Sequence, residues 1–248
     1  MTPQKPTLNA TFNRSSLTNP VKQGAQDSIP FMRDAFHDEL DSVGQTLIGM
    51  GQKVGRAMEL ATTALLTADL KLAEQVIADD DLIDSMQHEL DAKTLNLLAR
   101  QQPVAGDLRT LVTSLRMSAD LERMGDLAHH VAKLARMRYP ATAVPPELAL
   151  TIQEMGNVAK RIIEKATRVI ETHDLAAALQ LEKDDDEMDK LHRKLFLTLL
   201  DDAWPHGIET AIDMTLLGRY YERCADHAVS VARRVYFLVT GEYASDEA

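Results

Sequence analysis

Apolar residues recur at steps of three and four along almost the whole chain from Phe36 onward, which constrains its fold more than any other feature. Because an α-helix has 3.6 residues per turn, these steps place apolar side chains on one helical face. Pro, Gly and small polar residues interrupt the pattern. The sequence therefore predicts an all-α protein with long helices over residues 34–67, 70–101, 104–138, 147–172, 175–202 and 207–240.

These helices form two copies of a three-helix unit. Aligning residues 69–84 with 174–189 pairs eight identical residues in sixteen, including a run of three Asp in each. Further along, residues 121–132 align with 221–232 and share a Glu-Arg-x-x-Asp motif. Helical periodicity alone would not align these acids, so we infer a duplication. Short turns make successive helices antiparallel neighbours, which predicts two tandem, pseudo-symmetric three-helix bundles.

The interruptions also suggest a domain organisation. Residues 1–31 hold four prolines and no helical period, which is typical of a disordered tail. An alternative for this tail is a basic arm that docks on an acidic partner. We expect four parts: the tail 1–31, a first bundle 32–139, a second bundle 147–240 and a short C-terminal tail 241–248.

Composition excludes several classes of protein. A net charge of −11, from 27 basic and 38 acidic residues, argues against direct nucleic-acid binding. A single cysteine, Cys224, excludes an intrachain disulfide framework and fits a reducing cytoplasm. The longest uncharged stretch, residues 42–52, is too short to span a bilayer. Neither a Gly-rich phosphate loop nor a nucleophile elbow is present, so we expect no enzyme.

The repeated acids are the candidate functional residues. In each copy, a Glu and an Asp four residues apart share one face of the third helix, and two Asp four residues apart lie on the second helix. Each bundle therefore offers two carboxylate pairs on adjacent helices. The predicted metal ligands are Asp80, Asp84, Glu122, Asp126, Asp185, Asp189, Glu222 and Asp226.

Clustered carboxylates repel one another, and a cation relieves that cost. Oxygen ligands suit Mg²⁺, Mn²⁺, Ca²⁺ or iron, whereas zinc usually takes more His or Cys. His129 and His192, three residues after Asp126 and Asp189, could add nitrogen ligands. The alternative is a solvated acidic face without metal. The interleaved arginines fit ion-pair partners better than phosphate-binding groups; they are Arg116, Arg123, Arg219 and Arg223.

Three segments carry a resemblance to a known family. DLERMGD at residues 120–126 and ERCADHA at 222–228 resemble the twin signature of the PhoU family, and QPVAGDLR at 102–109 resembles its second-to-third helix turn. The likeness covers residues 32–240. It implies a cytoplasmic, non-enzymatic, often dimeric regulator of phosphate-specific transport, with only indirect membrane association. Such proteins negatively regulate phosphate uptake and starvation signalling through the phosphate ABC transporter ATPase and a sensor histidine kinase.

The resemblance also bears on the acids. Some family members bind metal clusters through the motif residues, which here are Glu122, Asp126, Glu222 and Asp226. The aspartates of the second and fifth helices would be their partners. Two alternatives stay open: a metal storage or redox bundle, and a helical scaffold that binds no metal.

Overall fold

The computed structural model describes the backbone of residues 28–243 and the side chains from residue 35. The chain divides into two compact units, Met1–His37 and Asp38–Ala248. Most of the predicted N-terminal tail and residues 244–248 therefore lie outside the described residues. The proposed division into two bundle domains stays a prediction.

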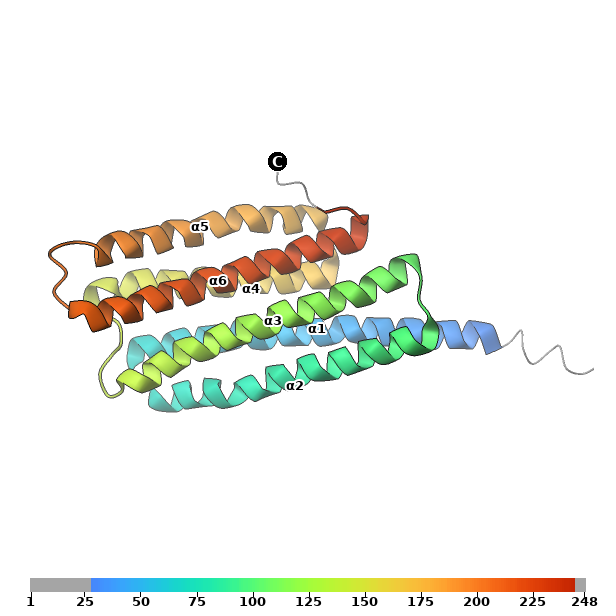
Figure 1. Cartoon of the computed structure of the whole chain (residues 1–248), viewed down its shortest axis with the longest axis horizontal. Helices are drawn as coiled ribbons and strands as arrows, with labels where there is room; N and C mark the ends of the chain where they lie inside the picture. Colours follow the sequence, from blue (N-terminus) through green and yellow to red (C-terminus); the bar gives the residue numbers. More distant parts are fainter. Residues whose placement is uncertain (1–27, 244–248) are drawn as a thin grey trace, which may run out of the picture. The chain divides into compact units, whose positions relative to one another are not determined.

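The described residues form six α-helices and no strand, which confirms the all-α class (Figure 1). Their bounds are α1 Ser28–Thr67, α2 Leu70–Gln101, α3 Ala105–Arg138, α4 Ala149–Thr172, α5 Leu175–Leu199 and α6 Gly207–Thr240, with a 3₁₀ turn η1 at Pro146–Leu148. None of these helices is long and apolar enough to cross a membrane.

Side-chain caps explain two of the sharp helix starts. Asp69 accepts a hydrogen bond from the Leu72 amide (3.0 Å) at the start of α2. Asp174, its counterpart in the second copy, accepts from the Ala176 and Ala177 amides (2.9 and 3.0 Å) at the start of α5. A carboxylate at this position satisfies amides that have no partner within the helix. The duplication therefore preserved the cap as well as the helix.

Within Asp38–Ala248, each copy packs as a triplet of helices. In the first copy α2 packs on α3, and Lys93 of α2 donates to the Ser42 hydroxyl of α1 (2.6 Å). In the second, α4, α5 and α6 all contact one another. The triplets meet where α3 packs on α6 (Figure 1). Completely buried core side chains come from both copies: Met50, Met58, Leu121, Met124, Ile152, Met155, Leu217 and Val231.

A second contact between the copies joins α1 to α4. A Cβ added at Gly51 would lie 3.0 Å from Thr167 Cγ2, and one at Gly156 would lie 2.7 Å from Thr62 Oγ1. Gly156 and Thr167 are the counterparts of Gly51 and Thr62 at an offset of 105 residues. The two close approaches are therefore one contact made twice, as expected for a pseudo-twofold interface.

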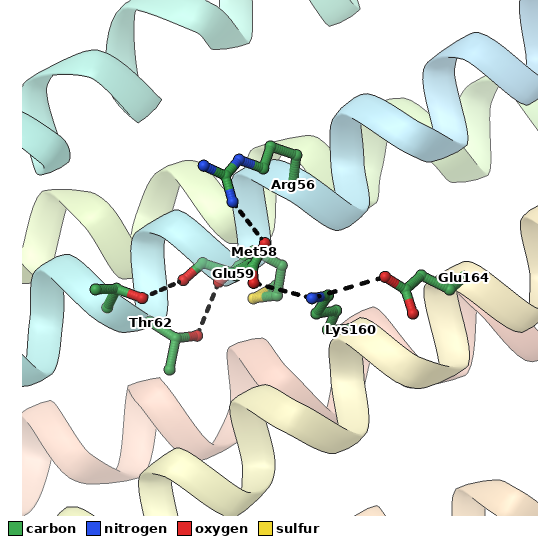
Figure 2. Close-up of polar contacts among 7 residues, drawn as sticks. Arg56, Met58, Glu59, Thr62, Lys160 and Glu164 are labelled. Carbon is green, nitrogen blue, oxygen red and sulfur yellow. Dashed lines mark hydrogen bonds and ion pairs between the residues drawn. The ribbon is translucent and has the colours of Figure 1, made fainter.

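Polar side chains line the same contact. Glu59 of α1 accepts from Arg56 (2.7 Å) and from Lys160 of α4 (2.9 Å), as Figure 2 shows. Lys160 also lies 3.8 Å from Glu164 on its own helix. Along the two helices these ion pairs lie between the Gly51–Thr167 contact and the Gly156–Thr62 contact.

Candidate functional site

The structure places four of the predicted acids along the line where α2 packs on α3. We call Asp80, Asp84, Glu122 and Asp126 the first acidic seam. Asp80 is buried and its Oδ2 pairs with Nδ1 of His129, one turn beyond the seam on α3. Asp126 accepts from Arg123 on the same helix (3.2 Å). Sequence reasoning had linked His129 to Asp126, but the structure links it to Asp80.

Two carboxylates of this seam are poorly compensated. Burial raises the pKa of Asp84, and the nearby charges of Asp80 and Asp126 raise it further. Burial also raises the pKa of Glu122, as does the charge of Asp126, while Arg123 opposes the shift. The Oδ1 atom of Asp84 is buried and has no hydrogen-bond partner. Acids of α2 and acids of α3 thus raise one another's pKa across the contact between the two helices.

Gly125 permits this close packing of α3 on α2. A Cβ at residue 125 would lie 3.1 Å from Ile83 and 3.4 Å from Asp80 Oδ1. The second copy has Ala225 at the matched position. The glycine of the first signature motif therefore lies directly beside the acids.

The matching acids of the second copy lie between α5 and α6; we call Asp185, Asp189, Glu222 and Asp226 the second acidic seam. Burial, followed by the charges of Asp226, Asp189 and Glu222, raises the pKa of Asp185 to about 6. Burial likewise raises the pKa of Glu222, whose Oε1 pairs with Arg219 and whose Oε2 is buried without a partner. Asp189 and Asp226 are exposed.

The histidines make the two seams unequal. His192 of α5 lies against Gly218 of α6, where an added Cβ would lie 3.1 Å from its ring, and its Nε2 is buried without a partner. Burial lowers the pKa of His192, and the charge of Arg219 adds to that effect. The counterpart of His192 in the first copy is Gln87, and that of His129 in the second is Val229.

These observations define the chemistry available. Within residues 35–243, no group of three or more His, Cys, Asp or Glu side chains is arranged so that it could hold a metal ion. Oxygen donors that repel one another and include a buried, unpartnered atom in each seam do fit a hard cation. Burial raises the pKa of the Cys224 thiol to about 12, so this cysteine is not an available nucleophile.

The sequence predicted some of the side-chain ion pairs in the structure and missed others. The ion pairs of Arg123 with Asp126 and Arg219 with Glu222 agree with the reading of these arginines as charge partners. Sequence reasoning missed a buried cluster between α3 and α6, in which Asp120 accepts from Arg234 Nε (2.6 Å) and lies 3.1 Å from His227 Nδ1. The available signal was Asp120 itself, an acid among apolar residues whose counterpart is Tyr220.

Known proteins resemble this chain over most of its length. Residues 47–135 and 152–235, one stretch in each copy, match the PhoU domain family. The chain is 50% identical to the phosphate-specific transport system accessory protein PhoU homolog 2 of Mycobacterium bovis, over 86% of this chain and 100% of that protein. It is 48% identical to PhoU homolog 1 of Mycobacterium leprae, over 87% of this chain and 97% of that protein.

Solved structures share the fold. The crystal structure of PhoU from Pseudomonas aeruginosa superposes with a TM-score of 0.76 at 30% identity, covering 84% of this chain and 100% of that one. The phosphate transport system regulatory protein PhoU from Streptococcus pneumoniae gives a TM-score of 0.75 at 25% identity, covering 85% and 99%. The likeness therefore spans both helical triplets.

Proposed function

The chain belongs to the PhoU family, and on that premise we propose that it is a cytoplasmic accessory regulator of phosphate transport without catalytic activity of its own. The observation that carries this proposal is the 50% identity, over the full length of the relative, to a phosphate-specific transport system accessory protein. The protein would lower phosphate uptake and starvation signalling when phosphate is plentiful. It would do so by shifting the populations of its partners' conformations.

The partners we propose are the ATPase of the phosphate ABC transporter and a sensor histidine kinase, with the regulator acting as a homodimer. Exposed apolar side chains support a binding role, since patches of such side chains mark interaction sites. Five of them belong to helix segments at one end of the second triplet, where α4 begins, α5 ends and α6 begins (Figure 1). They are Leu150, Leu197, Leu200, Ile208 and Ile212.

Association can be tested by capturing the tagged chain from phosphate-replete and phosphate-starved cells and probing for both partners. We expect both to co-purify, more strongly when phosphate is plentiful. A variant with Leu200→Gln and Ile208→Gln should lose a partner, whereas Leu95→Gln, at an exposed apolar site on α2, should not. Absence of both partners at every phosphate level would overturn the proposal.

We also propose that each acidic seam binds a cation. The buried, unpartnered oxygens of Asp84 and Glu222 support this, because an uncompensated buried carboxylate is costly. In the first seam Asp80, Asp84, Glu122 and Asp126 would hold the ion, and their counterparts would do so in the second. The bound charge would neutralise the repulsion and cross-link α2 to α3 and α5 to α6. Iron, Mg²⁺, Mn²⁺ and Ca²⁺ suit these ligands best.

Metal content after purification without chelator tests the second proposal. A variant carrying Asp84→Asn and Glu122→Gln should lose the metal of the first seam and keep that of the second. The control variant carries Glu74→Gln and Glu89→Gln, two exposed acids of α2, and should keep both. Equal metal content in all three proteins would overturn the assignment and leave a scaffold without metal. Many iron atoms per chain with oxidase turnover would instead indicate storage or redox chemistry.

A further inference from the structure

A basic groove lies between α3 and α6, apart from both acidic seams. Its volume is about 200 Å³. Three arginines, three hydroxyl-bearing side chains and one phenylalanine line it: Arg116, Arg233, Arg234, Thr113, Ser230, Tyr243 and Phe237. Among the described residues no acid lines this groove, although the whole chain carries a net charge of −11.

Arg116 and Arg234 keep hydrogen-bond donors for a ligand. Arg116 is exposed and has no ion pair within the described residues. Arg234 uses its Nε–H for Asp120 (2.6 Å) and Arg233 directs its Nε–H to Glu182 (2.7 Å). A guanidinium carries five N–H donors, so donors remain on Arg234 beyond the one that Asp120 accepts. Thr113, Ser230 and Tyr243 add hydroxyl groups that can donate as well.

A fourth arginine lies beside the groove. The guanidinium carbon of Arg109 is 6.0 Å from the centre of the Phe237 ring, and the Tyr243 ring stacks on Phe237 at 4.5 Å. Nε of Arg109 is buried and has no partner. Its Nη1 lies where a Cβ at Gly241 would stand, so the glycine makes room for it. Arg109 therefore adds a positive charge beside the groove, while Asp120 and Glu182 each pair with one of the lining arginines.

The duplication supplies an internal control for this charge. The matched groove of the other copy is lined by His130, Leu134, Leu216 and Tyr220, among others. At an offset of 100 residues, Arg116 corresponds to Leu216 and Arg234 to Leu134. Since leucine serves at both positions in the other copy, packing of α3 on α6 does not require the arginines.

We propose that this groove binds a small ligand through a phosphate group, supplied by inorganic phosphate or by a nucleotide. Guanidinium groups form two parallel hydrogen bonds to phosphate oxygens, which makes arginine well suited to this anion. The remaining oxygens would accept from Thr113, Ser230 or Tyr243. This inference rests on the groove alone, so it holds or fails independently of the metal sites and of partner binding.

Calorimetric titration of the full chain tests the inference, in buffer with chelator so that no metal bridges the anion. One arm uses inorganic phosphate, a second uses ATP and a third uses sulfate as the anion control. Arg116→Leu installs the residue of the other copy and should weaken binding at least about tenfold. Arg136→Leu removes an equally exposed arginine of α3 and should leave binding unchanged.

Binding of phosphate alone, or of ATP alone, supports the inference and identifies the source of the phosphate group. If Arg116→Leu lowers the thermal midpoint, Arg116→Gln takes its place in the same titrations. The inference is overturned if neither phosphate nor ATP binds, if sulfate binds as tightly as both, or if the Arg116 and Arg136 variants bind alike.

Discussion

Some carboxylates of the acidic seams are less favourably placed in the folded protein than in the unfolded chain, where water surrounds them. Asp185 is the clearest case. Its pKa rises from 3.8 to about 6 because it is partly buried beside other acids. The folded protein therefore holds this proton more firmly than the unfolded chain does. As pH rises from about 4 to about 6, Asp185 loses its proton and the free energy of unfolding falls. Above that range the full cost of the charged, partly buried carboxylate is present.

Asp185→Asn should remove this cost in metal-free protein. We expect the variant to exceed the wild type by about 1–2 kcal/mol at about pH 8, after allowance for solvent screening, and to match it at about pH 4. Urea unfolding at the two pH values measures the difference. Asp186→Asn, an exposed neighbour, should change little at either pH. A stability gain of the same size at both pH values for the Asp185 variant would contradict the argument.

For the eight acids, the sequence predicted the helix on which each one lies but not its individual environment. Spacing placed all eight acids on the correct helices. It treated Asp189 and Asp185 alike, whereas Asp189 is exposed and Asp185 carries the large shift. Exposure depends on how α5 is rotated about its axis against α6. A period of about 3.6 residues per turn indicates the buried face of a helix but not this rotation. The Asp80–His129 pair depends on the same rotation of α2 against α3.

Helix ends were predicted accurately where they have local causes. The ends of α2 and the start of α5 agree with prediction, since the side chains of Asp69 and Asp174 cap the helices that follow them and Pro103 comes just after the end of α2. The start of α1 at Ser28 is earlier than predicted: Pro30 falls in the first turn, where the missing N–H has no acceptor within the helix. The predicted C-terminal extension of α5 to residue 202 is wrong because the helix ends at Leu199.

The contact between α1 and α4 gives a prediction that runs against helix propensity. Gly156→Ala favours the helix by up to about 1 kcal/mol, but its Cβ would meet Thr62, which is fixed by hydrogen bonds to the Met58 carbonyl and the Tyr221 hydroxyl (both 2.8 Å). We expect a net loss of about 1–3 kcal/mol in unfolding free energy.

Gly44→Ala is the matched control, since nothing lies within 4 Å of the added Cβ on α1. It should be neutral or slightly stabilising in the same denaturation experiment. Combining Gly156→Ala with Thr62→Ala should recover part of the loss, which a double-mutant cycle detects as non-additivity. Equal stabilisation by the two glycine variants would show that α1 and α4 are not in close contact.

A bound cation would hold two helices together, so it should raise the free energy of unfolding. At a concentration of Mn²⁺ about 100-fold above its dissociation constant, we expect each occupied seam to add about 2.7 kcal/mol to the unfolding free energy. A variant with Asp84→Asn and Glu122→Gln should retain only the contribution of the second seam. Thermal unfolding with and without chelator measures both. An unchanged response in that variant would place the ion elsewhere.

Within Asp38–Ala248, the two copies contact each other at more places than the duplication alone predicts. Duplication predicted two triplets, but it did not predict that α3 would pack on α6 or that Gly51 and Gly156 would join α1 to α4. In the sequence, residues that make contacts between the copies look the same as residues buried within one copy. Thr62 of the first copy, for example, is buried and bonds to Tyr221 of the second. Asp38–Ala248 is accordingly one compact unit.

This sharing predicts a single cooperative unfolding transition for Asp38–Ala248. If the first triplet unfolded alone, the second would expose Tyr221, which is fully buried and bonds to Thr62 of the first. The chain offers a local probe: its single tryptophan, Trp204, lies between α5 and α6, donates to the Gly207 carbonyl (2.9 Å) and contacts the His206 ring edge-on. Trp204 fluorescence therefore follows the second triplet, while far-ultraviolet ellipticity follows all the helices.

The two signals should give the same urea midpoint, as a two-state transition requires, and Gly156→Ala should lower both midpoints equally. Separate midpoints would mean that the copies fold independently despite their shared surface.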